Sequence, residues 1–145
     1  MTENDITYQI RGAIYQVYKA LGPGLLEAVY EEALTYELQK RGLKVERQLE
    51  VPILYDGKQL NTNLRLDMLV EDKVIIELKS VAEMKDVFYK QTLTYCKLLN
   101  KKLGILVNIS AKKYYGMWGD DGMTDEDFIN ELKSMRNFRH DIVEL

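Results

Sequence analysis

Three charged residues interrupt an apolar stretch near the middle of the chain. Residues 65–80 read RLDMLVEDKVIIELKS, with Asp67, Glu77 and Lys79 in or beside its two apolar runs. The second run has the β-branched, apolar character of a strand buried on both faces. An unpaired charge in such a strand costs several kcal/mol. These charges therefore either pair with one another or bind a cation and a polar substrate.

The turn between the two runs decides whether these charges meet. A three-residue loop at 71–73 places Asp67 opposite Glu77 and predicts one shared face. It also places Arg65 opposite Lys79 on that face. A two-residue loop would turn Glu77 away, because one step of slip inverts every side chain. Two carboxylates directly opposite each other repel unless a cation lies between them, so the three-residue loop calls for a metal ion.

This pattern is the layout of a metal-dependent phosphodiesterase site. Two carboxylates on neighbouring strands can hold Mg²⁺, which prefers octahedral oxygen ligands and keeps several waters. The metal would stabilise charge on the phosphate and activate a bound water. Lys79 shares the face of Glu77 and is predicted to orient that water or to pair with a phosphate oxygen. From these residues alone, a structural Asp-Lys or Glu-Lys ion pair is an equal alternative.

An N-terminal helical hairpin is expected to supply a third carboxylate. Apolar residues at three- and four-residue spacing predict a helix over 5–20, capped by Asn4 or Asp5. Gly22-Pro23-Gly24 ends it, and a second helix follows and stops at Gly42. On that helix Glu27 lies at or beside the buried face, whereas the later glutamates Glu31, Glu32 and Glu37 are expected to be solvent charges. A first-turn carboxylate favoured by the helix dipole is the structural alternative for Glu27.

A mixed sheet is expected to follow the hairpin. Alternating residues from 43 to 55 predict a strand with a bulge near Gln48, and Asp56-Gly57 is a hairpin signal. Two further strands complete an antiparallel meander, and a helix over 82–99 leads to a strand at 103–110 whose crossover length favours parallel pairing. Beyond Ser110 we expect a short strand at 112–118, a helix over 125–135 capped by Thr124, and a frayed end.

Composition places the chain among ordinary globular proteins. With 145 residues, 46% hydrophobic and 30% charged, residues 1–145 are expected to form one domain. No apolar run approaches a membrane span and no signal-peptide pattern is present, which predicts a cytoplasmic protein without a membrane partner. The lone Cys96 excludes an internal disulfide and a four-cysteine zinc site. A net charge of −3 gives no overall positive charge that would indicate nucleic-acid binding, although it does not exclude such binding.

The order of motifs resembles one known family. GPGLLEAVYEEAL contains Gly24, Glu27 and Tyr30 at the spacing that names the GxxExxY family. It is followed by RGLKVE, VPILYDG, RLDMLV, VIIELKS and QTLTYCKLL. The resemblance covers about residues 5–109 and leaves 111–145 as a C-terminal extension. That family is assigned to the PD-(D/E)xK nuclease-like superfamily.

The resemblance implies a fold and a site. The fold is an α/β restriction-endonuclease-like core, with a mixed sheet of about four strands flanked by helices. The resemblance marks Asp67, Glu77 and Lys79 as signature residues, with Glu27 as the helix carboxylate and Gln91 as a glutamine lining the site. The implied metal ligands are Asp67, Glu77 and Glu27. Mg²⁺ or Mn²⁺ is the implied cofactor and a nucleic acid, DNA rather than RNA, the implied partner, with a homodimer expected by analogy.

Two departures from the family pattern stand in this chain. Tyr18 occupies a position where the family commonly has a histidine, and Asn63-Leu64 replace a frequent Gly-Tyr pair. The leading hypothesis is a Mg²⁺-dependent nuclease. The alternatives are a non-catalytic binding or assembly module on the same fold and a hydrolase of a small phosphoester.

Overall fold

A computed structural model describes residues 1–81, 83–109 and 142–144 of the chain. Its helices and strands follow one another as α1 (Glu3–Leu21), α2 (Glu27–Lys40), β1 (Val45–Tyr55), β2 (Lys58–Val70), β3 (Val74–Lys79), α3 (Asp86–Leu99), β4 (Leu103–Asn108) and β5 (Ile142–Glu144). The strand expected at 112–118 and the helix expected at 125–135 lie outside the described residues. In the described part, no helix is both long and apolar enough to cross a membrane.

The five strands form one mixed sheet in the order β1-β2-β3-β4-β5. The first three strands are antiparallel, β4 runs parallel to β3, and β5 pairs antiparallel with β4. The predicted meander and parallel crossover are therefore confirmed. The fifth strand corrects the expectation of a frayed end: three residues are too few to show a period in the sequence, and backbone pairing with β4 defines them as a strand.

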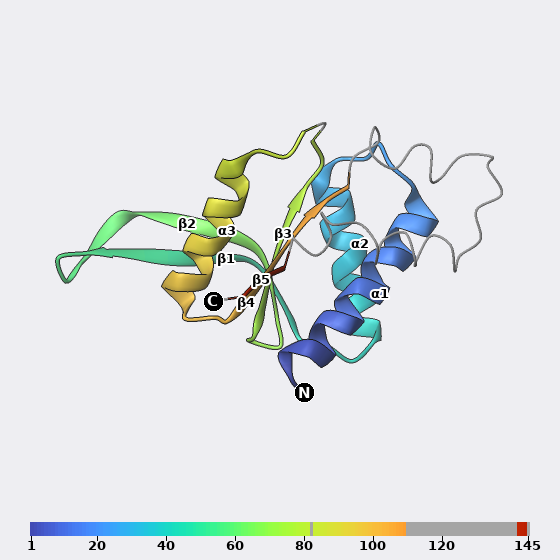
Figure 1. The fold of residues 1–145 in the computed structure, drawn as a ribbon, viewed down its shortest axis with the longest axis horizontal. Coiled ribbons are helices and arrows are strands. Elements are labelled where there is room, and N and C mark those ends of the chain that lie inside the picture. Colours follow the sequence, from blue (N-terminus) through green and yellow to red (C-terminus); the bar gives the residue numbers. More distant parts are fainter. Residues whose placement is uncertain (82, 110–141, 145) are drawn as a thin grey trace.

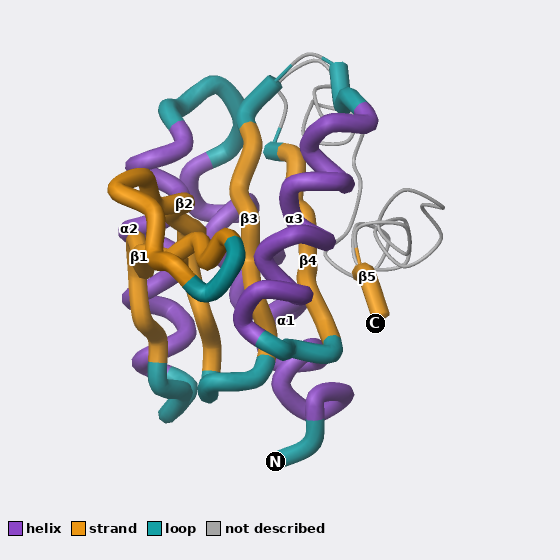
Figure 2. Tube along the Cα trace, turned by 90° about the vertical axis from the view of Figure 1, so that its left-hand side faces the viewer, coloured by secondary structure: helices purple, strands orange, loops and turns teal. Residues whose placement is uncertain are grey.

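Helices cover both faces of this sheet (Figures 1 and 2). On one face α1 and α2 pack their apolar stripes against β2, β3 and β4 in the larger core. On the other face α3 places Tyr95 and Cys96 over Leu66, Leu69 and Ile75. Alternate residues of β3 enter opposite cores, so the strand is buried on both sides as its β-branched run predicts. The charge of Glu77 on β3 is consequently surrounded by protein, whereas Lys79 at the end of the strand is half-buried.

The helical hairpin is held together at its turn. Thr2 caps α1 in a capping box with Asp5, so the helix begins at Glu3, ahead of the expected caps Asn4 and Asp5. The turn after α1 uses positive φ angles at Gly22 and Gly24. The Tyr30 hydroxyl donates to the carbonyl of Gly22 at 2.5 Å and accepts from the backbone N–H of Leu25 at 3.1 Å. This contact fixes where α2 begins.

The β1–β2 hairpin extends well beyond β3 (Figure 1). Asp56 and Gly57 both have positive φ and form the predicted two-residue turn. The bulge expected near Gln48 is misplaced, because the register shifts between Pro52 and Leu54 instead. Proline has no backbone N–H to donate, which explains an irregularity beside it. Gln48 keeps the register but has a φ of 48°.

Candidate active site

The two signature carboxylates lie where β2 and β3 stop pairing as strands. Val70 is opposite Val74 and Met68 opposite Ile76, which confirms the three-residue loop. Beyond this ladder, Asp67 N–H donates to Glu77 Oε1 at 3.0 Å, and Leu78 N–H donates to Asp67 Oδ2 at 2.7 Å. Each carboxylate thus takes the place of a cross-strand carbonyl. The predicted juxtaposition of Asp67 and Glu77 is therefore present.

Burial and mutual repulsion keep a proton on this pair. Only 4% of Glu77 is exposed. Loss of hydration, followed by the nearby charge of Asp67, raises the pKa of Glu77 to about 8. Burial also raises the pKa of Asp67, although the N–H of Leu78 opposes this by donating to its carboxylate. Without a nearby cation, the protein does not offset the negative charge that both carboxylates would carry, so Glu77 stays protonated at neutral pH.

Lys79 lies beside this pair without closing an ion pair. Its Nζ is 4.9 Å from the centroid of the Phe88 ring, a cation–π distance. Its charge lowers the pKa of both Asp67 and Glu77, but less than burial raises them. Among the described residues no ion pair links Lys79 to an acidic side chain. The structural Asp-Lys or Glu-Lys pair considered from the sequence is therefore not formed.

Glu27 reaches the end of β3 and binds backbone there. Its Oε1 accepts from the N–H of Ser80 at 2.9 Å, and the residue is exposed rather than at the buried face as expected. Its charge reaches Asp67 and helps to raise that pKa. Within the part of the chain that the structure describes, no group of three or more Asp, Glu, His or Cys side chains is close enough to hold a metal ion. Glu27 is thus a neighbour of the carboxylate pair in this conformation.

Gln91 reaches the surroundings of the carboxylate pair through Tyr95, and within the described part of the chain no hydrogen bond joins it to Asp67 or Glu77 directly. On α3 its Nε2 donates to the hydroxyl of Tyr95 at 2.9 Å, and that hydroxyl donates to the carbonyl of Arg65 at 3.1 Å. Burial raises the pKa of Tyr95, and the negative charges of Glu77 and Asp67 raise it further. Gln91 therefore orients the tyrosine that faces the carboxylates from the α3 side.

Arg65 does not join the shared face that the register predicted. Its Nη2 is 2.8 Å from Glu50 Oε1, and both side chains are more than half exposed. The reason is that β2 and β3 pair only as far as Met68, so the extrapolated Arg65–Lys79 position has no ladder beneath it. Arg65 instead pairs across the β1–β2 ladder, where its partner is Glu50.

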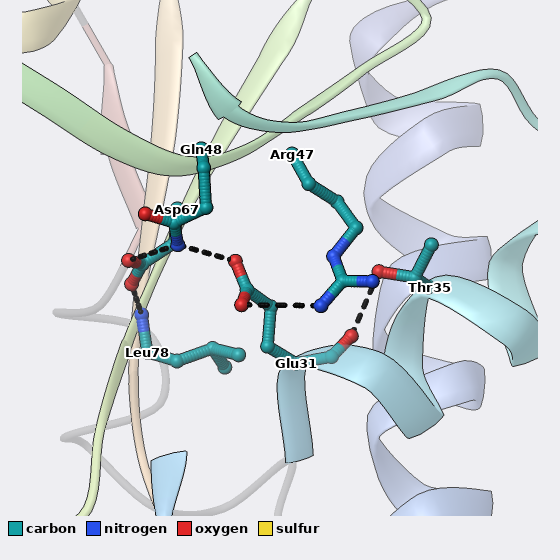
Figure 3. A network of polar contacts seen from close by, with 6 residues as sticks. All are labelled: Glu31, Thr35, Arg47, Gln48, Asp67 and Leu78. Atoms are coloured by element: carbon teal, nitrogen blue, oxygen red, sulfur yellow. Dashed lines mark hydrogen bonds and ion pairs between the residues drawn. The ribbon is translucent and has the colours of Figure 1, made fainter. Parts of the chain in front are cut away.

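A second carboxylate on α2, Glu31, lies close to the pair and was assigned to solvent from the sequence. Only 7% of Glu31 is exposed. Gln48 Nε2 donates to Glu31 Oε1 at 2.7 Å and to Asp67 Oδ1 at 3.5 Å, while Arg47 Nη2 lies 3.4 Å from Glu31 Oε2 (Figure 3). The spacing could have revealed Glu31, because it follows Glu27 by one helical turn on the same side of α2.

The donor set suits a divalent cation. Asp67 and Glu77 each give one oxygen to a backbone N–H, which holds both carboxylates at fixed positions. Mg²⁺ is commonly bound by one or two carboxylates and completes its octahedron with water and phosphate oxygens. A cation between the two carboxylates would also remove the repulsion that raises the pKa of Glu77. The residues present therefore fit Mg²⁺ or Mn²⁺.

Comparison with known proteins gives one family. The model of the PD-(D/E)XK nuclease superfamily matches residues 4–117, most of the chain. No curated protein matches. A solved structure described as "Crystal structure of SSO0001" is 20% identical with a TM-score of 0.44, over 72% of this chain and 60% of that one. This chain thus spans about three fifths of the length of that protein. The family match does not distinguish the GxxExxY family, which stays a prediction.

Proposed function

Because the chain belongs to the PD-(D/E)XK nuclease superfamily, we propose that it is a Mg²⁺-dependent nuclease that hydrolyses nucleic-acid phosphodiester bonds. The observation that carries the proposal is the insertion of Asp67 and Glu77 between the ends of β2 and β3, with Lys79 beside them. Buried carboxylates that repel each other destabilise a fold unless they serve a ligand. A divalent cation is the ligand that this pair suits.

Each residue of the proposed site has a separate task. Asp67 and Glu77 hold the cation, which when bound stabilises charge on the phosphate and lowers the pKa of a coordinated water. Lys79, free of an ion pair in the described part of the chain, orients the attacking water or contacts a phosphate oxygen. Glu27 and Gln91 act at the edge, where they hold Ser80 and Tyr95.

The finer assignments of this proposal rest on the resemblance to the GxxExxY family for substrate and dimer, and on length and composition for location and domain. The substrate we favour is DNA over RNA, acted on by a cytoplasmic protein whose residues 1–145 form one nuclease-like domain and which pairs as a homodimer. The alternatives are a non-catalytic binding module and a hydrolase of small phosphoesters. Lys79 contacts the Phe88 ring rather than a carboxylate, which does not support the ion-pair network expected of the binding module. The phosphoester hydrolase would use the same metal chemistry and differs only in substrate.

A cleavage assay tests this function directly. The purified protein is incubated with single- and double-stranded DNA and RNA, and with a small phosphodiester, in Mg²⁺, Mn²⁺ or chelator. We expect metal-dependent cleavage that falls about a thousandfold in Asp67→Asn and in Lys79→Met. Lys97→Met, an exposed lysine on α3, is the matched control and should cleave normally. Absence of metal-dependent cleavage, or undiminished cleavage by Lys79→Met, would reject the proposal.

A further inference from the structure

Gln48 has an unusual backbone at a position directly across from Asp67. Arg47 pairs with Met68 and Leu49 with Leu66, so the register puts Gln48 opposite Asp67. The φ of Gln48 is 48°, in the left-handed region that residues other than glycine, asparagine and aspartate rarely adopt. Sequence neighbours on both sides keep ordinary strand pairing. The distortion is therefore confined to the residue that faces the candidate metal ligand.

The Gln48 side chain lies between two carboxylates. Its Nε2 donates to Glu31 Oε1 at 2.7 Å and to Asp67 Oδ1 at 3.5 Å (Figure 3). Both partners are acceptors, which requires the amide to present its NH₂ group to them. An uncharged donor thus holds two negative groups together. An apolar side chain here would leave them unbridged.

The contacts continue from Gln48 into α2. Glu31 is buried, and Arg47 Nη2 approaches its other oxygen at 3.4 Å. On the opposite side, Asp67 Oδ2 accepts from Leu78 N–H at 2.7 Å. Asp67 is therefore held through one oxygen by the backbone of β3 and approached at the other by Gln48. The first hold uses a backbone N–H and does not depend on residue 48, whereas the second depends on the Gln48 side chain alone.

We propose that Gln48 is a positioning residue, which connects Glu31 to Asp67 and so sets the affinity of the Asp67–Glu77 site for a divalent cation. This inference rests on the proposed function, because it assigns Gln48 a role at that same site. Residues that hydrogen-bond metal-ligating carboxylates restrict their rotation, and removing one typically weakens metal binding ten- to a hundredfold. The contact to Asp67 is at the long limit of a hydrogen bond, so we expect the lower value.

The test separates the side chain from the backbone distortion. Gln48→Gly removes the amide and also accepts the positive φ without strain. Mn²⁺ binding is measured directly by electron paramagnetic resonance on the full chain, and thermal unfolding is followed in chelator. We expect Mn²⁺ affinity to fall about tenfold, with a melting temperature in chelator that is unchanged or higher. Gln59→Gly, at an exposed glutamine of β2, should leave Mn²⁺ affinity unchanged.

Two Glu31 variants test the connection to α2. Glu31→Gln loses the charge that acts on Asp67 but keeps an oxygen that accepts from Gln48. Glu31→Leu loses both the charge and the acceptor, so it should bind Mn²⁺ about tenfold more weakly than Glu31→Gln. A second readout is the Mn²⁺ concentration that gives half-maximal cleavage, which should rise tenfold in Gln48→Gly while kcat recovers at saturating Mn²⁺. Structural damage would lower kcat at every concentration.

The outcomes distinguish this inference from the function beneath it. If the wild-type chain binds no Mn²⁺, both the proposed function and the role of Gln48 are overturned. If the wild type binds Mn²⁺ and Gln48→Gly binds it equally well, only the role of Gln48 is overturned. A tenfold loss in Gln48→Gly, together with a tenfold difference between Glu31→Gln and Glu31→Leu, supports the connection as drawn, and equal affinities of the two Glu31 variants overturn it.

Discussion

The two ends of the β2–β3 pair differ in what holds the strands together. Next to the turn, backbone pairing joins Met68 to Ile76, and both side chains are fully buried and apolar. At the other end the backbone of each strand binds a carboxylate of its neighbour, Asp67 or Glu77. The first end contributes stability by excluding water. The second buries charge, and the apolar end of the same hairpin supports it.

This contrast shows how a small domain can hold buried charge. A strand pair that was apolar throughout would continue its ladder and leave no room for a ligand. Here Asp67 and Glu77 each give one oxygen to a backbone N–H of the neighbouring strand, which leaves the second oxygen of each for a side-chain donor or a cation. Charge burial at such a site costs stability, as strain does at functional sites generally, and the surrounding core makes it tolerable.

The largest expected effect comes from breaking the apolar end. Ile76→Ala should lower the free energy of unfolding by roughly 2–5 kcal/mol, because Ile76 is fully buried between Met68 and Ile105. Urea unfolding in chelator measures this loss. Leu54→Ala, at a side chain 67% exposed near the hairpin tip, is the control and should change little. Equal losses in both variants would contradict the assignment of Ile76 to the supporting core.

At the charged end, stability of the metal-free protein should fall as the pH rises. Below the usual pKa of 4.5, Glu77 is protonated in the folded and unfolded chain alike. As the pH rises from 4.5 to 8 the unfolded chain releases this proton first, so the folded state loses stability until Glu77 itself ionises near pH 8. We expect a loss of roughly 2–4 kcal/mol over this window. Glu77→Gln should flatten the dependence, and an unchanged slope would contradict burial as its cause.

Addition of a divalent cation should reverse that loss. At a hundredfold excess over its Kd, Mg²⁺ or Mn²⁺ should stabilise the wild-type chain by about 2.7 kcal/mol. The effect should disappear in Asp67→Asn. It should persist in Asp72→Asn, an exposed aspartate in the turn at the other end of the hairpin. Thermal unfolding at pH 8 with and without cation measures it, and stabilisation that survives Asp67→Asn would place the cation elsewhere.

The smallest change in stability is expected at Arg65, which lies on β2 beyond the last residue that pairs with β3. Arg65→Ala breaks an exposed pair with Glu50 and should cost less than about 1 kcal/mol. Cleavage should remain at the wild-type level, because the guanidinium points away from the carboxylate pair toward β1. A large loss of activity in this variant would show that Arg65 belongs to the site, as the extrapolated register predicts. Unfolding and cleavage assays on the same preparation decide the matter.

Local sequence patterns are enough to predict several elements of this fold. The helical hairpin, the Asp56-Gly57 turn, the meander and the parallel crossover follow from periodicity, turn residues and connection length. The three-residue loop at 71–73 was the decisive local feature. It set the register and hence brought Asp67 opposite Glu77.

The residues that surround the Asp67–Glu77 pair follow from packing between elements that are distant in the sequence. A continuous ladder would place Arg65 opposite Lys79, but pairing between β2 and β3 ends at Met68, where the carboxylates are inserted. Glu27 is exposed and Glu31 buried, the reverse of the expectation, because Arg47 and Gln48 of β1 cover Glu31 whereas Glu27 is the first residue of α2. Gln48 bridges Glu31 and Asp67 because β1 packs beside α2, a contact that the sequence pattern does not predict. Charges that are far apart in the sequence come together through packing, and a local sequence pattern cannot predict which of them will be in contact.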